Sequence, residues 1–286
     1  MARRPLQSCA LILTGLFAIS STRLPAAESE PTSDDAAVKA LKDARLRSMR
    51  ELAEAISVEA VKENAAIKLG LVEDARFRFN SPTIACDDAT VWVWGRTGRP
   101  AAVLTLSGTW PTAGRDGIWS YEFTSLSPSK LRATNSGDWE WTPQESGVEF
   151  QDVPNAPPPS DSATRRLGQM KDIARRFGGF ALYNGKVDKP SRFRVLPTPL
   201  HRYDDPDAGV LDGAMFVVAV DTNPEALLLI ELVKAAPNPI WKFGVNRVSM
   251  GEIHATLDEK EVWKSPPGGQ MTSESRYFIV MRRMSP

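Results

Sequence analysis

The stretch AMFVVAVDTNPEALLLIE, Ala214 to Glu231, decides the fold. Two apolar runs, from Ala214 to Val220 and from Ala226 to Val233, flank the polar segment Asp221 to Glu225. Apolar runs of this length on either side of turn-forming residues predict a buried β-hairpin. Short spacing between such runs recurs along the chain and favours antiparallel pairing, because parallel crossovers need a dozen or more residues.

A weak internal repeat relates this hairpin to an earlier one. An ungapped alignment of Ala89 to Leu106 with Ala214 to Glu231 gives identities at Ala89/Ala214, Val93/Val218, Thr97/Thr222, Ala101/Ala226 and Leu104/Leu229. Arg-Phe-Arg precedes each copy, at 76–78 and 192–194, and the second copy carries nine more residues before the aligned alanine. The extra residues fall around His201 to Gly209, which we interpret as an expanded connection that projects from the frame.

The predicted fold class is α+β, with an N-terminal helix plus two related antiparallel β units, sandwich-like in type, joined by a Pro-rich linker and an amphipathic helix. Helical spacing of apolar residues predicts the first helix from about Ser33 to Glu63. The expected division is a signal peptide at 1–27, a polar tether and N-terminal helix at 28–70, a first β unit at 71–153, the linker and second helix at 154–179, and a second β unit at 180–286.

The N-terminus has the three parts of a secretory signal: a basic start at Arg3-Arg4, an apolar segment from Leu6 to Ile19, and small residues at Ala26-Ala27. The apolar segment is short for a bilayer crossing, which needs about 20 apolar residues. We therefore expect a secreted or periplasmic protein with no transmembrane segment after signal removal. Cys86 is then the single cysteine, so no intramolecular disulfide is available, and we interpret it as a small buried residue with a nucleophile as the alternative.

The mature chain is close to neutral, because removal of residues 1–27 leaves 32 basic and 35 acidic residues. A chain that binds nucleic acid needs a basic face to neutralise phosphates. We expect no nucleic-acid partner.

The segment LHRYDDPDAGVLDGAMF, Leu200 to Phe216, holds one of the two histidines beside four aspartates. His201 and Tyr203 are candidate binding residues, and Asp205, Asp207 and Asp212 are candidate ligands of Ca²⁺, which prefers carboxylate oxygens. The spacing departs from the regular DxDxDG loop and has no Glu at position 12. The alternative is a polar turn in which the aspartates bond to nearby backbone amides.

Eight tryptophans are the other visible feature. The i, i+2 pairs Trp92 with Trp94 and Trp139 with Trp141 each place two indoles on one strand face. Such a pair can stack on a carbohydrate or fill a sandwich core. Core packing is the favoured interpretation of these pairs, and Trp139 and Trp141, which flank Glu140, are the candidate exposed pair that would bind a carbohydrate or another envelope component.

No phosphate loop, dinucleotide fingerprint, HExxH, CxxC or GxSxG pattern occurs, so no catalytic residue is assigned. The favoured function is a non-catalytic binding or envelope-associated module. The alternative is an extracytoplasmic hydrolase with a site around His201 and Asp204, Asp205 and Asp207.

Seven segments resemble a family of uncharacterised secreted proteins from large-genome environmental bacteria. They are GRPAAV (Gly98 to Val103), YEFTSLS (Tyr121 to Ser127), GVEF (Gly147 to Phe150), RRLGQMKDIARRF (Arg165 to Phe177), LPTPLHRY (Leu196 to Tyr203), LDGAMF (Leu211 to Phe216) and TNPEALLLIE (Thr222 to Glu231). The resemblance covers most of the mature chain without the N-terminal helix, and it implies no activity. Similar proteins carry a further His where this chain has Tyr121 or Thr124, so no role for an imidazole is expected there.

Overall fold

The computed structural model of the chain describes residues 33–62, 65–81, 86–145, 147–183, 189–269 and 271–284. The chain divides into two compact units, Met1–Ala40 and Leu41–Pro286. The described part of the first unit is the start of helix α1 (Ser33–Glu54). The predicted signal peptide, 1–27, and the tether up to residue 32 lie outside the described residues.

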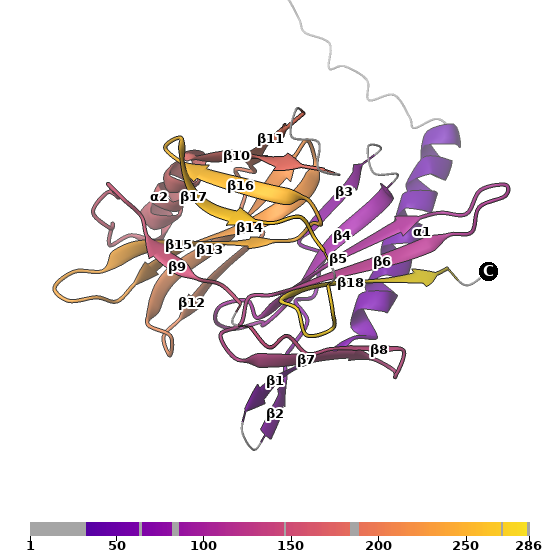
Figure 1. Cartoon of the computed structure of the whole chain (residues 1–286), viewed down its shortest axis with the longest axis horizontal. Coiled ribbons are helices and arrows are strands. Elements are labelled where there is room, and N and C mark those ends of the chain that lie inside the picture. The colour runs from indigo at the N-terminus through magenta and orange to yellow at the C-terminus, as the bar shows by residue number, and fades with distance from the viewer. Residues whose placement is uncertain are drawn as a thin grey trace, which may run out of the picture. The chain divides into compact units, whose positions relative to one another are not determined.

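Within the described ranges, the strands of the second unit form three sheets in which every ladder is antiparallel (Figure 1). The four-stranded sheet has the order β2-β1-β7-β8 and consists of β1 (Ser57–Lys62), β2 (Ala65–Lys68), β7 (Lys130–Asn135) and β8 (Trp139–Trp141). The five-stranded sheet has the order β18-β6-β5-β4-β3 and consists of β3 (Phe77–Ser81), β4 (Cys86–Trp94), β5 (Ala102–Thr109), β6 (Ile118–Ser125) and β18 (Tyr277–Arg283).

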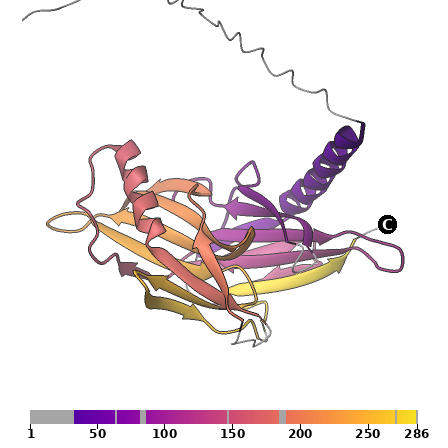
Figure 2. The same ribbon diagram turned by 90° about the horizontal axis from the view of Figure 1, so that it is seen from above.

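The nine-stranded sheet has the order β17-β16-β10-β11-β13-β14-β15-β9, and β12 also pairs with β13. It consists of β9 (Phe150–Asp152), β10 (Phe177–Leu182), β11 (Ser191–Val195), β12 (His201–Asp205), β13 (Val210–Val220), β14 (Asn223–Val233), β15 (Ile240–Arg247), β16 (Glu252–Leu257) and β17 (Lys260–Ser265). Helix α2 (Ala163–Arg175) covers one face of this sheet through Met170, Ile173 and Ala174 (Figure 2).

Strands β4 and β13 are buried on both faces. From β4, Val91 and Val93 pack with Met215 and Val217 of β13, so the five-stranded and nine-stranded sheets share one core. The alternate residues of β4, Trp92 and Trp94, pack in a second core with α1 and the four-stranded sheet, while those of β13 pack under α2. Strand segments covered on two sides are apolar on both faces, as Val91 to Trp94 and Ala214 to Val220 are, which explains the continuous apolar runs in the sequence.

The prediction of an α+β protein dominated by antiparallel sheets is confirmed. The predicted end of the first helix, near Glu63, is wrong, because α1 ends at Glu54 and the next residues form β1. Strand β1 pairs with β7, so that Val58 lies opposite Ala133 and is fully buried. This long-range pairing outweighs the local helical period.

The two segments of the internal repeat both lie in antiparallel hairpins, β4–β5 and β13–β14. Their registers differ by two residues, since Val93 pairs with Val103 whereas Val218 pairs with Ala226. The predicted β units also do not coincide with the sheets, because β9 pairs with β15 and β18 pairs with β6. A duplication stays a prediction.

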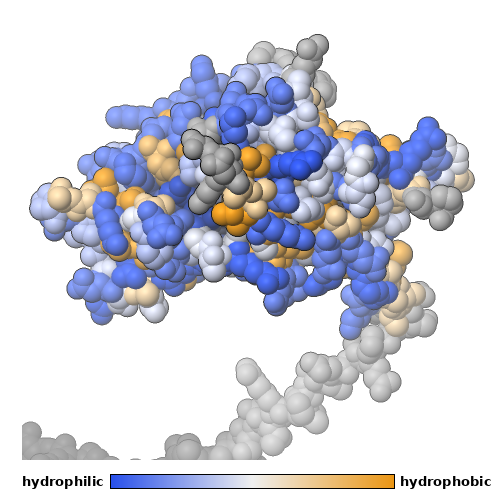
Figure 3. Space-filling model, turned by 90° about the horizontal axis from the view of Figure 1, so that it is seen from below, coloured by the Kyte–Doolittle hydropathy of each residue, from blue (hydrophilic) through white to orange (hydrophobic). Residues whose placement is uncertain are grey.

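No helix in the described part of the chain is both long and apolar enough for a bilayer crossing. On the face that Figure 3 shows, hydrophobic areas lie within predominantly hydrophilic surface. The exposed large apolar side chains include Ile67 of β2 and Met281 of β18, both on strands at sheet edges.

A partly buried ion pair also connects the two large sheets. Arg99, in the connection from β4 to β5, donates to both oxygens of Glu231 on β14, at 2.6 and 2.7 Å. Glu231 is only 1% exposed and also accepts a hydrogen bond of 2.7 Å from the Tyr203 hydroxyl. The Asp205 carboxylate accepts from the backbone N–H of Arg99 at 3.0 Å. The geometry is bidentate, which is the strongest form of an Arg–carboxylate contact.

Replacement of Arg99 by alanine is expected to lower the free energy of unfolding by about 3–5 kcal/mol, because it leaves the Glu231 carboxylate buried without its cation. Arg132→Ala is the matched control: it removes an ion pair with Glu140 in which both side chains are 50% exposed. Its expected effect is below about 1 kcal/mol. Urea denaturation measures both, and equal losses would refute this role of Arg99.

Candidate functional site

A cavity of about 280 Å³ lies between the five-stranded sheet and loops at one end of the nine-stranded sheet. Its floor comes from neighbouring strands of the five-stranded sheet, whose registers set the side chains in rows. One row runs Ile279, Glu122, Thr105, and the next runs Met281, Ser120, Ser107. These residues face the nine-stranded sheet because β5 and β6 alternate: Leu104, Leu106, Tyr121 and Phe123 point to the opposite core.

The roof consists of three loop segments of the nine-stranded sheet. They are Tyr183 after β10, Asn223 and Pro224 at the β13–β14 turn, and Val248 to Gly251 between β15 and β16. Glu225 ties these segments together, since its carboxylate accepts hydrogen bonds from the Tyr183 hydroxyl, from Asn223 Nδ2 at 2.6 Å and from Ser249 Oγ at 2.6 Å. Burial raises the pKa of Glu225, and these hydrogen bonds act against that shift.

Arg247 fixes the shape of the last loop. Its guanidinium is buried and donates to the backbone oxygens of Ser249, Gly251 and Pro266 at 2.7 to 2.9 Å. It also lies 5.0 Å from the ring centre of Tyr277, on β18. Burial lowers the pKa of Arg247. Because its donors are directed at backbone carbonyls, Arg247 positions the roof and is not one of the residues that line the cavity.

Glu122 and Thr105 are the polar pair on the floor. They are cross-strand partners on β6 and β5, and on one face such partners have Cβ atoms about 5 Å apart. Glu122 Oε2 accepts a hydrogen bond from the Tyr277 hydroxyl, while its Oε1 has no partner among the described residues. Thr105 is 5% exposed, and its Oγ1 also has no partner among those residues. A buried hydroxyl left unpaired costs about 1–3 kcal/mol, so this cavity holds unused hydrogen-bonding capacity.

The electrostatic environment keeps Glu122 partly protonated near neutrality. Burial raises the pKa of Glu122 from 4.5 to about 7, and the nearby Glu225 carboxylate adds to this effect. The hydrogen bond from Tyr277 and the charge of Arg247 act in the opposite direction. Carboxyl groups with pKa values near the working pH are suited to proton exchange and to switchable charge.

Cys86 lines the far wall of the cavity and is 6% exposed. Burial raises the pKa of its thiol to about 11. Since the thiolate is the nucleophile, this thiol is unreactive at neutral pH, as a structural residue is.

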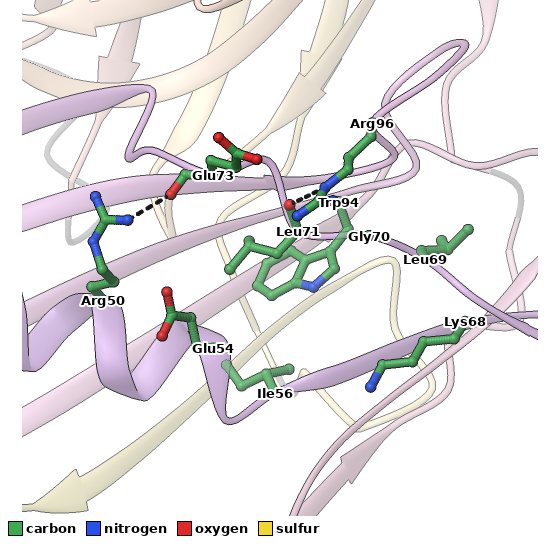
Figure 4. Close-up of a pocket in the computed structure, with 10 residues that line it drawn as sticks. All are labelled: Arg50, Glu54, Ile56, Lys68, Leu69, Gly70, Leu71, Glu73, Trp94 and Arg96. Carbon is green, nitrogen blue, oxygen red and sulfur yellow. Dashed lines mark hydrogen bonds between the residues drawn. The ribbon is translucent and has the colours of Figure 1, made fainter.

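A larger groove of about 600 Å³ lies beside the end of α1 (Figure 4). Arg50 and Glu54 are on the α1 side, and Lys68 and Arg96 are on the opposite side. Arg50 bonds to Glu73 O at 2.9 Å and to Asp74 Oδ1 at 2.6 Å, and Arg96 Nε bonds to Leu71 O at 2.8 Å. The hydrogen bonds of its arginines therefore go to the neighbouring loops. We take the smaller cavity between the sheets as the candidate site, because it contains the unpaired Thr105 hydroxyl.

The residues of the predicted site around His201 do not converge on one point. His201, Arg202, Tyr203, Asp204 and Asp205 form strand β12, so the prediction of an expanded connection here is wrong for these five residues. Strand β12 instead pairs with β13, and His201 lies opposite Met215. His201 lines a small hollow with Arg76 and Arg96, and burial together with Arg76 lowers its pKa. No hydrogen bond joins the imidazole to an aspartate within the described residues.

The candidate calcium ligands are also separated by their partners. Asp205 accepts from the backbone of Arg99 and Ala208, whereas Asp212 is paired with Arg166 and Arg202 at 2.8 and 2.7 Å. Asp207 lies in the β12–β13 turn. In the described ranges, no group of three or more His, Cys, Asp or Glu side chains is arranged to hold a metal ion.

The interpretation of Trp139 and Trp141 as an exposed pair is wrong. Trp139 is 8% exposed and Trp141 is fully buried, because β8 packs against β6. Phe123 contacts both indoles, with ring centres at 5.0 and 5.3 Å. Trp141 Nε1 donates to Ser275 O at 2.8 Å. The favoured interpretation, that these aromatic side chains fill the core, is what the structure shows. Tyr203, the remaining candidate, is buried and bonded to Glu231.

Sequence reasoning missed Glu122 and Thr105. A usable signal was present, since Ser120, Glu122 and Thr124 alternate with large aromatic residues along one strand. Alternation of this kind normally places the polar residues in water. The exception arises because a second sheet covers that face, which local sequence does not reveal.

Glu122→Gln is expected to remove a pH dependence of stability. The folded-state pKa of Glu122, about 7, lies above the ordinary value of 4.5, so its contribution is fully present below about pH 4.5 and is lost as the pH rises through 7. Relative to the variant, wild type should lose about 3 kcal/mol of unfolding free energy between pH 4.5 and pH 8. Urea titrations at each pH measure the difference, with Glu140→Gln as an exposed control. Parallel curves for wild type and Glu122→Gln would contradict the assignment.

None of the protein-family models, curated proteins and solved structures with which the chain was compared matches it. Folds in any case host unrelated functions, so the functional conclusion must come from the site itself. The site offers a cavity, an unpaired hydroxyl and a carboxyl that can change its charge near pH 7.

Proposed function

We propose that the protein is an exported, non-catalytic binding module that takes a small molecule into the cavity between its two large sheets. The observation that carries this proposal is that the cross-strand neighbours Thr105 and Glu122 each bring an oxygen to the cavity floor, Oγ1 and Oε1, for which no hydrogen-bond partner occurs among the described residues. Binding sites characteristically combine apolar walls with a few convergent polar groups.

The size of the cavity supports a small ligand. Its volume of about 280 Å³ lies just below the range for ligand pockets, which is about 300–1,000 Å³, so it suits a ligand smaller than a typical drug. The walls are largely preformed, because the Arg247 and Glu225 hydrogen bonds hold the roof loops. A preformed site binds with little loss of conformational entropy.

Export and membership of the family of secreted bacterial proteins stay predictions from the sequence. So does attachment to the cell envelope. Carbohydrate binding on Trp139 and Trp141 has no support, since the two indoles are buried. Calcium binding and the alternative hydrolase at His201 and Asp204, Asp205 and Asp207 likewise stay predictions that no observed contact favours.

Filling the cavity tests the proposal. A panel of small amphipathic molecules, charged and neutral, is screened by thermal shift against wild type and Ser120→Phe, which places a ring over the floor. Ligands that raise the Tm of wild type should leave that of Ser120→Phe unchanged. Ser129→Phe, at an exposed loop position, is the control and should respond like wild type. Hits that bind all three proteins equally, or a panel without hits, would refute the proposal.

A further inference from the structure

Among the described residues, those that line the cavity carry one ionisable carboxyl, that of Glu122, and no arginine, lysine or histidine. The nearest cation, Arg247, directs its donors to the roof backbone. An anionic ligand would therefore enter a desolvated site beside a like charge, which is strongly unfavourable. A cation would instead find a carboxylate that has a free oxygen.

The hydrogen-bonding groups on the floor favour a ligand that donates. When Glu122 is ionised, its Oε1 accepts only, and the hydroxyls of Thr105, Ser107 and Ser120 on the adjacent rows can all accept. A primary ammonium group has three donors and matches this set. A quaternary ammonium group has none and would leave Thr105 unpaired.

Much of the remaining wall is apolar: Ile279 and Met281 on β18, Pro224 and Val248 in the roof, and Phe79 on β3. The polar side chains of the roof, Tyr183, Asn223 and Ser249, already donate to Glu225. The apolar side chains suit a short hydrocarbon body attached to the ammonium group.

From this arrangement we infer that the ligand is a small organic primary ammonium ion, bound between Glu122 and Thr105 with its apolar body against β18 and the roof. This inference rests on the proposed function of the cavity and specifies its ligand class.

Binding is then linked to pH. The charged and titratable groups that face Glu122 are Tyr277 from β18, Arg247 from β15, Glu225 from β14, and, around the cavity, Tyr183 and Cys86. Burial raises the pKa values of both tyrosines and of the thiol, so Glu122 is the lining group that titrates near neutrality. An alkylammonium ion keeps its proton there, as a lysine side chain with a pKa of about 10.4 does. Affinity should consequently rise with pH as Glu122 ionises.

Calorimetric titration with phenethylammonium chloride tests the inference on the full chain. Wild type should bind it about tenfold more tightly at pH 8 than at pH 6, from the Glu122 pKa of about 7. The neutral analogue 2-phenylethanol, the anion phenylacetate and the quaternary phenethyltrimethylammonium ion should each bind at least about tenfold more weakly, because each lacks the charge or the donors.

Two isosteric variants identify the residues. Glu122→Gln should weaken phenethylammonium binding at least about tenfold and abolish its pH dependence, and Thr105→Val should weaken it about three- to tenfold without lowering the Tm. Retention of the Tm distinguishes loss of a ligand contact from loss of fold. Glu140→Gln, far from the floor in sequence and exposed, should bind like wild type.

The outcomes separate the two proposals. If 2-phenylethanol or phenylacetate binds wild type as tightly as the ammonium ion, and Ser120→Phe abolishes that binding, the cavity is a binding site and the ammonium inference is overturned. If Glu122→Gln binds phenethylammonium as wild type does, the inference is also overturned. If none of the four compounds binds, the ammonium inference and the proposed function both fail.

Discussion

The face that the five-stranded sheet turns toward the nine-stranded sheet changes from apolar to polar along its strands, and the structure depends on this change. At one end Val93, Val103 and Leu126 pack with Val217 and Leu229 in a continuous core. Two residues further along β5 and β6, the same face presents Thr105 and Glu122, which cannot pack dry against an apolar sheet without a large desolvation cost. The two sheets share a core at the first end, and a lined cavity takes its place at the second.

Buried polar contacts define where that cavity stops. Asn246, at the end of β15, donates to the backbone oxygens of Ser125 and Gly147 at 2.8 and 2.7 Å, and Thr124 Oγ1 donates to Arg247 O at 2.7 Å. These bonds attach the nine-stranded sheet to the end of β6 next to the floor. Arg247 and Glu225 then shape the roof from the other side. Polar groups of this kind contribute little net stability, but they restrict the core to one arrangement when every member is satisfied.

The sequence predicts the parts of this fold that are buried on two sides and fails where strands are polar. The β13–β14 hairpin follows from its two apolar runs, and β4 follows from its run of strand-forming residues, Thr90 to Trp94. Strand β1, by contrast, continues the charged pattern of α1, and its pairing with β2 and β7 makes it a strand. The site is hidden for a related reason. Local alternation correctly places Glu122 and Tyr121 on opposite faces of β6, and Trp139 on the same face as Trp141. Which face is covered depends on segments more than a hundred residues away, such as Pro224 and Val248, which line the cavity with Glu122.

The most direct measurement is the titration of the Glu122 side-chain carboxyl by ¹³C NMR, with the resonance assigned by its loss in Glu122→Gln. A carboxyl that lies under a second sheet, beside Glu225 and in contact with Tyr277, should titrate with a midpoint near pH 7. A midpoint near the ordinary value of 4.5 would place Glu122 in water and contradict a covered polar floor between the sheets.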